Sequence, residues 1–82
     1  MTEYHRSRVF TTEDVPKKLT GRHDTKKGVW AQVVVERGQV SLTIIDGDTV
    51  ALTAGQRGVA APQQAHFVTL APDSAFYLRF LR

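Results

Sequence analysis

The sequence predicts one small all-β domain built from two packed antiparallel sheets. Roughly six or seven short runs of strand-forming residues recur about every 8–12 residues, with turn residues between them, which is typical of a sandwich or barrel. From Val29 onward no segment keeps a helical period for more than a turn or two. A chain of 82 residues has room for a single thin core. We therefore expect one domain over residues 1–82, with residues 1–7 as a flexible lead-in.

The central strands follow from side-chain alternation. Residues 29–36, VWAQVVVE, are rich in β-branched side chains, and alternate positions 29, 31, 33 and 35 are apolar. After the Arg37-Gly38 turn, residues 39–45 place Val40, Leu42 and Ile44 on one face. The pair Asp46-Gly47 favours a positive φ angle and predicts a hairpin that leads into a strand over residues 49–53.

The remaining elements are bounded by turn residues. A strand over residues 57–61 ends before Pro62, which cannot donate a ladder hydrogen bond. Strands over 66–71 and 75–81 are separated by Pro-Asp-Ser. Near the start, residues 6–10 predict one more strand. Residues 11–15 predict a short helical turn, capped by a threonine and limited by Pro16.

Composition excludes several classes of protein. The chain has no cysteine, which excludes disulfides and cysteine-ligated zinc. It has no apolar run long enough for a membrane span or a signal peptide, so we expect a cytoplasmic protein without a membrane partner. Residues 1–27 hold seven Lys or Arg against four Asp or Glu, whereas residues 28–82 hold four of each. The body of the domain is neutral, so we do not expect nucleic-acid binding.

Two segments carry residues that a plain β-structure does not need. Residues 21–30 contain His23, Lys26 and Trp30, and residues 55–66 end at His66. The two histidines are too far apart in sequence to bind a metal ion within one turn or loop, but they could come together if the sheet folds back on itself. Strand parity places His66 on the same face as Val68, toward the interior.

The order of residues along the chain resembles a known family. The matching positions are Val15-Pro16, Leu19, His23-x-Thr25-Lys26-x-Gly28-x-Trp30, Gly38, Leu52-Thr53-x-Gly55-x-x-Gly58, Pro62-x-x-x-His66-x-Val68 and Phe76-Tyr77-x-x-Phe80. This pattern is similar to the cupins, and more closely to a small cupin-like family labelled tellurite-resistance-related. That family occurs as a stand-alone domain and as an N-terminal extension of a methyltransferase. The resemblance implies a cupin-like jelly-roll β-barrel.

The resemblance also implies a depleted metal site. His23 and His66 match the first and last metal-binding histidines of cupins, but Thr25 stands in place of the second histidine, and Val29 or Trp30 in place of the glutamate. Two imidazoles hold a divalent ion weakly, and zinc is the expected one. Asp24 could add an oxygen, although alternation would point it away from His23. Lys26, with Thr25 and Trp30, would contact a small anionic ligand.

Three functions stay open. The first is a non-catalytic module that binds a divalent metal, a small anion, or both, in a tellurite-type stress response. The second is a metal-dependent oxygenase or isomerase, although no catalytic residue is assigned. The third is an interaction domain with a vestigial pocket, and a homodimer is possible in any of these. In the purely structural reading His23 bonds a loop carbonyl, His66 and Trp30 fill the core, and His5 is solvated.

Overall fold

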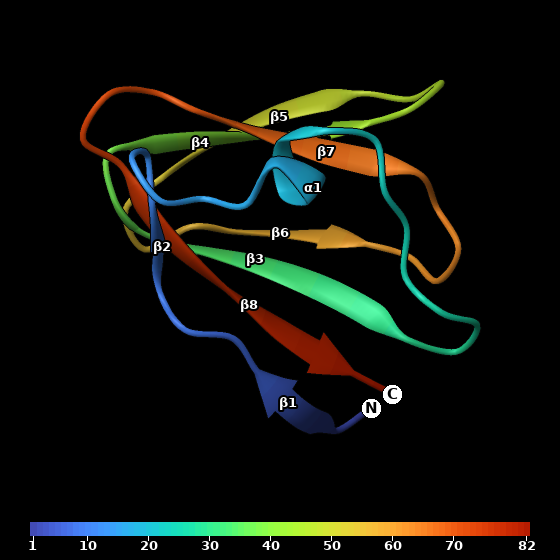
Figure 1. Ribbon diagram of the computed structural model, residues 1–82. Coiled ribbons are helices and arrows are strands. Elements are labelled where there is room, and N and C mark those ends of the chain that lie inside the picture. The colour runs from blue at the N-terminus through green and yellow to red at the C-terminus, as the bar shows by residue number, and fades with distance from the viewer.

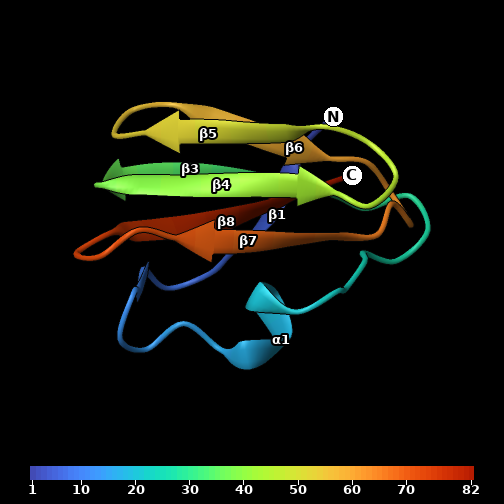
Figure 2. The same ribbon diagram turned by 90° about the horizontal axis from the view of Figure 1, so that it is seen from above.

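The computed structural model describes residues 1–82 and shows two antiparallel sheets packed face to face (Figures 1 and 2). The larger sheet has the order β1-β8-β3-β6, with β2 also paired to β8. The smaller sheet has the order β5-β4-β7. A single helical turn, α1 (Lys17–Thr20), lies beside β7. The predicted all-β class with two packed sheets is confirmed.

The strand bounds place the elements in the chain. The larger sheet consists of β1 (Glu3–Arg6), β2 (Phe10–Thr11), β3 (Trp30–Arg37), β6 (Arg57–Ala60) and β8 (Ala75–Leu81). The smaller sheet consists of β4 (Gln39–Ile44), β5 (Thr49–Thr53) and β7 (His66–Leu70). From β3 onward each strand lies within one residue of its predicted bounds, because alternation and turn residues there agree with one another.

The sheets do not close into the predicted jelly-roll barrel. No hydrogen-bonded ladder joins the two sheets, so the fold is an open sandwich. The chain passes from β3 in one sheet to β4 in the other through Gly38, instead of pairing them as a hairpin. Only an isolated bridge between His23 and His66 adds a further pairing, at the free edge of β7. The segment before β3 therefore covers the gap that a closed barrel would seal.

The core lies between the sheets and follows the predicted alternation. Its buried side chains come from both sheets and from α1: Leu19, Val33, Val35, Val40, Leu42, Leu52, Val68, Phe76 and Leu78. Phe76 is the largest side chain with no exposure to solvent. Burial of these apolar side chains is the main stabilising contribution in a domain of this size.

The N-terminal third differs from the prediction. Instead of one strand over residues 6–10, β1 and β2 pair with β8 on either side of an irregular segment. Residues 11–15 form the predicted single turn, closed by a hydrogen bond from the Val15 N–H to the Thr11 carbonyl at 2.9 Å, and the Asp14 carboxylate accepts a hydrogen bond from the Thr11 N–H at 2.7 Å. The helix begins one residue after Pro16, whose φ angle of −61° suits a helix start. Helix α1, with four residues, is far shorter than the roughly 20 that a membrane-spanning helix needs.

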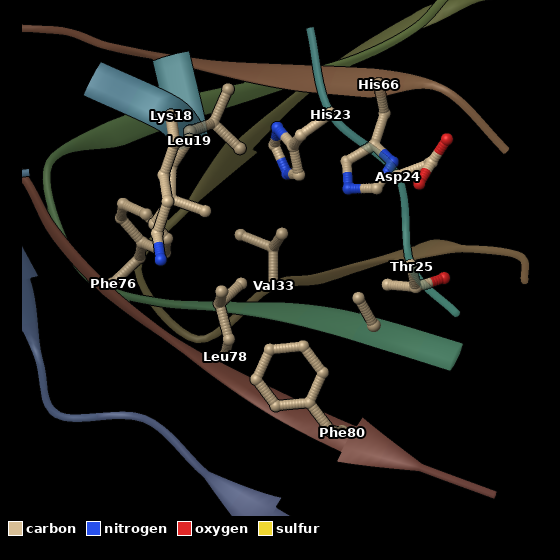
Figure 3. Close-up of a pocket in the computed structure, with 12 residues that line it drawn as sticks. Lys18, Leu19, His23, Asp24, Thr25, Val33, His66, Phe76, Leu78 and Phe80 are labelled. Atoms are coloured by element: carbon tan, nitrogen blue, oxygen red, sulfur yellow. The ribbon is translucent and has the colours of Figure 1, made fainter. Parts of the chain in front are cut away.

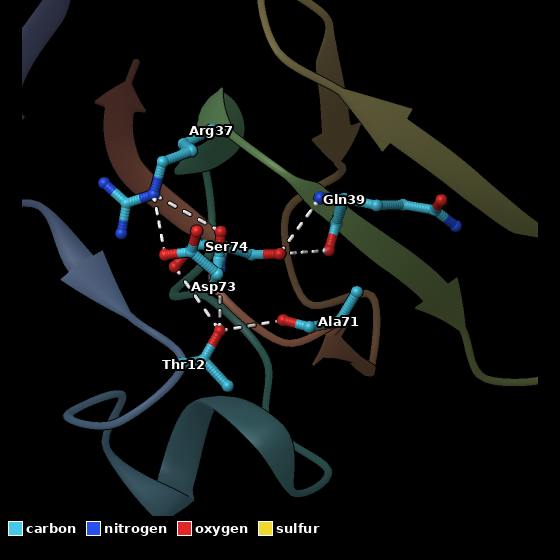
Figure 4. Close-up of polar contacts among 6 residues, drawn as sticks. All are labelled: Thr12, Arg37, Gln39, Ala71, Asp73 and Ser74. Atoms are coloured by element: carbon cyan, nitrogen blue, oxygen red, sulfur yellow. Dashed lines mark hydrogen bonds and ion pairs between the residues drawn. The ribbon is translucent and has the colours of Figure 1, made fainter.

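A buried serine, Ser74, links the turn before β8 to the start of β4 and to Thr12 (Figure 4). Ser74 is fully buried; its hydroxyl accepts from the Gln39 N–H at 3.0 Å and donates to the Gln39 carbonyl at 3.1 Å. The Thr12 hydroxyl accepts from the Ser74 N–H at 2.9 Å and donates to the Ala71 carbonyl at 2.8 Å. These bonds satisfy buried backbone groups where three segments meet.

Candidate functional site

A cavity of about 240 Å³ lies between the sheets, next to α1 and the segment that precedes β3 (Figure 3). Its polar lining residues are Lys18, His23, Asp24, Thr25 and His66. Its apolar lining residues are Leu19, Ala31, Val33, Val68, Phe76, Leu78 and Phe80. The two sequence segments that carry the predicted histidines thus converge on one interior space.

The two histidines lie side by side. The backbone N–H of His23 donates to the backbone carbonyl of His66 at 3.0 Å, and the backbone N–H of His66 donates to the backbone carbonyl of His23 at 2.8 Å. Their ring centroids are 4.2 Å apart in an edge-to-face arrangement. The isolated bridge therefore sets the spacing of the two imidazoles.

Each imidazole uses one nitrogen to anchor itself. The Nδ1 atom of His23 lies 2.9 Å from the Gly21 carbonyl, and that of His66 lies 2.6 Å from the Gln64 carbonyl. A carbonyl oxygen only accepts hydrogen bonds, so both Nδ1 atoms carry the proton. In the neutral ring this leaves the Nε2 lone pair free. This hydrogen bond from His23 to a loop carbonyl was predicted for the case in which the histidine has a purely structural role.

His66 is the only buried histidine, with 3% of its surface exposed. Burial lowers the pKa of His66 below the ordinary value of 6.5, and the proximity of His23 lowers it further. The bond to the Gln64 carbonyl and the charge of Asp24 oppose this shift of the pKa but do not outweigh burial. At neutral pH the His66 ring is therefore uncharged, and its Nε2 accepts a proton or a hydrogen bond.

The cation that faces the cavity is Lys18, which sequence reasoning missed. Figure 3 shows its side chain extending from α1 along the cavity wall toward Phe76. Lys26 is exposed in the turn before β3 and does not line the cavity. No sequence signal indicates Lys18, because helix α1 has no side-chain cap and was not predicted.

The other predicted ligand contacts occupy different places. Thr25 lines the cavity, but its hydroxyl donates to the Val29 carbonyl at 2.7 Å and so holds the turn. Trp30 begins β3, is half-buried, and belongs neither to the cavity lining nor to the core cluster. His5 is exposed on β1 and stacks on Phe80, with ring centroids 5.7 Å apart.

The residues present do not make a complete metal site. No group of three or more His, Asp or Glu side chains is placed to hold an ion together. Asp24 lines the cavity, contrary to the direction expected from strand alternation, because residues 24 and 25 lie outside any strand. Two imidazoles alone fall short of the three protein ligands that a zinc centre normally has.

The comparisons with known proteins agree with this fold. A crystal structure of a protein from E. coli strain K12 superposes with a TM-score of 0.88 at 20% identity, covering 96% of this chain and 87% of that one. TehB from Haemophilus influenzae superposes with a TM-score of 0.83 at 24% identity, and the match covers 96% of this chain but 30% of TehB. No curated protein matches the sequence. The family model of the TehB-like domain matches residues 5–78, which confirms the resemblance to a tellurite-resistance-related family, and the chain belongs to the TehB-like domain family.

Proposed function

We propose that this TehB-like domain is a non-catalytic module that binds a small anion in the histidine-lined cavity, as part of resistance to tellurite or a related oxyanion. The observation that supports the proposal is the pairing of two imidazoles, each anchored through Nδ1, with their Nε2 atoms free at a cavity that Lys18 also lines. Anchored side chains keep their geometry when a ligand arrives, which lowers the entropic cost of binding.

Protonation couples to the binding of an anion at this site. A neutral Nδ1–H imidazole offers only a lone pair at Nε2, so it cannot donate to an anion there. Proton uptake converts Nε2 into a charged donor, and the bound anion then stabilises the imidazolium. We expect binding near pH 7 to take up a proton and to strengthen as the pH falls toward the pKa of His66.

Calorimetric titration in two buffers that differ in ionisation enthalpy measures this proton uptake. The probes are tellurite and a set of simple carboxylates, each titrated into the purified chain. Lys18→Met should weaken binding by about fivefold, which corresponds to about 1 kcal/mol for an exposed charge. Lys26→Met is the matched control and should leave the affinity unchanged. The proposal fails if no probe binds, or if the two lysine variants behave alike.

A weak zinc site is the second candidate, and the two neighbouring Nε2 lone pairs favour it. Its pH dependence has the opposite sign, because zinc competes with protons for Nε2 and binds less tightly as the pH falls. A zinc titration at pH 7.5 and pH 6 therefore separates the two candidates. His66→Asn removes Nε2 and should abolish zinc binding, whereas a nonspecific surface site would survive the substitution.

The other predicted functions stay as alternatives. A metal-dependent oxygenase or isomerase would need a proton-transfer group, and Asp24 is the only carboxylate that lines the cavity. An interaction domain with a vestigial pocket would bind none of the probes. The cytoplasmic location and the homodimer stay predictions, as does the occurrence of relatives fused to a methyltransferase.

A further inference from the structure

We infer that the cavity is built for an organic carboxylate with a compact apolar body, and not for a bare inorganic oxyanion. The inference rests on the proposed function and names the ligand class for the same cavity. It follows from the distribution of polar groups around the cavity, from the cavity volume and from the groove next to it.

The cavity is polar near β7 and apolar along β3 and β8, and Lys18 brings one ammonium group to the wall beside Phe76. Figure 3 shows His23, His66 and Asp24 together near β7, whereas Val33, Leu78 and Phe80 lie across the cavity on β3 and β8. A ligand that fits this arrangement carries its charge at one end and hydrocarbon at the other.

An inorganic oxyanion does not match this lining. Its oxygens point in several directions and each one needs a hydrogen-bond donor once water is removed, since an unpaired charge is costly to bury. The Thr25 hydroxyl already donates to the Val29 carbonyl. The donors left are Lys18, beside Phe76, and, when protonated, the two histidines, so oxygens directed at Val33, Leu78 and Phe80 would lack partners.

The volume sets the size of the ligand. A dry protein cavity of about 150 Å³ holds benzene, with six non-hydrogen atoms. At the same packing, the 240 Å³ cavity holds about ten non-hydrogen atoms. Phenylacetate has about this size and carries one carboxylate at the end of an apolar body.

A second groove adjoins the cavity. It is lined by Tyr4, His5, Ser7 and Phe10 and shares Lys18, Leu19, Leu78 and Phe80 with the cavity. Lys18 therefore lies at the boundary of the two spaces. An ammonium group at that position attracts a carboxylate from solvent before the apolar body is buried.

The test compares acetate, isovalerate, phenylacetate, phosphate and tellurite by calorimetry on the wild-type chain at one pH and ionic strength. We expect phenylacetate to bind at least about tenfold more tightly than acetate, with isovalerate between them, because each buried hydrocarbon group adds to the affinity. The inference is overturned if tellurite, phosphate or acetate binds as tightly as phenylacetate, and the proposed function would survive that result. If none of the five binds, the proposed function itself fails.

A variant that fills the apolar end supplies an independent measurement. Ala31→Leu adds side-chain volume at a lining position that is 3% exposed. It should weaken phenylacetate by about tenfold or more and leave acetate unchanged, since acetate needs only the polar end. Equal loss of both ligands in a variant that unfolds at the wild-type temperature would contradict the inference.

Discussion

Among the glycines, Gly38 is the one at which an added side chain meets the closest neighbouring atoms. It carries the chain from β3 to β4 with a φ angle of +73°. A Cβ atom added there would lie 2.3 Å from the Ser74 hydroxyl oxygen and 2.9 Å from the Asp73 carbonyl oxygen. Both neighbours belong to the turn before β8 and are held in place, so Gly38→Ala must displace Ser74.

The cost of Gly38→Ala has two parts. A left-handed φ angle costs an alanine about 1–2 kcal/mol. Displacing Ser74 breaks its two hydrogen bonds with Gln39, at about 1 kcal/mol each. The substitution should therefore lower the free energy of unfolding by about 3–4 kcal/mol. Gly55→Ala is the matched control, because its φ angle is +87° and nothing lies within 4 Å of its added Cβ.

Urea unfolding followed by the fluorescence of Trp30 measures both variants, since the chain contains one tryptophan. Gly55→Ala should lose only about 1–2 kcal/mol. The remaining difference of about 2 kcal/mol corresponds to a gap in melting temperature of about 8–16 °C. A difference below about 0.5 kcal/mol between the unfolding free energies of the two variants would refute the steric argument. The argument would be supported if Gly55→Ala folds and Gly38→Ala does not.

Three further predictions concern single side chains. Thr12→Val should lower the free energy of unfolding by about 1–3 kcal/mol, because it leaves the buried Ser74 N–H unpaired, whereas Thr43→Val at an exposed pair should have almost no effect in the same urea assay. Asp46 has a φ angle of +62° in the β4–β5 turn, so Asp46→Val should lower the melting temperature and Asp46→Gly should not. The pKa of His66 is lowered on folding, so the unfolded chain binds the proton first as the pH falls below about 6.5, and stability should drop through that range. Urea titrations at pH 7.5 and pH 5 should show this loss in the wild type and less of it in His66→Asn, and equal losses would contradict it.

The sequence was most informative where alternation and turn residues agreed. The strands from β3 to β8 were predictable because positions such as Val33, Val40 and Leu42 alternate with polar residues between recognisable turns. Closure into a barrel was not predictable, since it depends on whether edge strands pair, and edge strands look like any others in sequence. The turn over residues 11–15 was predictable from its threonine and acidic residues, whereas helix α1 was not, because it follows Pro16 and has no side-chain cap.

The histidine pair could be predicted, but its surroundings could not. Strand parity correctly placed His66 with Val68 in the interior, and the family resemblance associated it with His23. Lys26 attracted attention as the cation nearest to His23 in sequence, yet Lys18 lines the cavity because α1 packs beside β7. Such a position depends on tertiary packing and leaves no local pattern in the chain.

The open sandwich gives the histidine pair a structural role beside its role at the cavity. Two backbone hydrogen bonds between His23 and His66 hold residues 21–25 against the free edge of β7, and a third bond runs from the Gln63 N–H to the Thr25 carbonyl at 3.2 Å. Alanine at His66 would remove the ring and also its anchor on the Gln64 carbonyl, so lost binding would not distinguish a ligand contact from a loosened segment.

Asparagine at position 66 separates the two roles. Its amide nitrogen takes the place of Nδ1 and still donates to the Gln64 carbonyl, whereas the group at Nε2 is lost. Because the backbone bridge to His23 does not depend on the side chain, the cavity wall should keep its position. A His66→Asn protein that keeps the wild-type amide-exchange protection at residue 23 but loses ligand binding would therefore assign the binding to Nε2 itself.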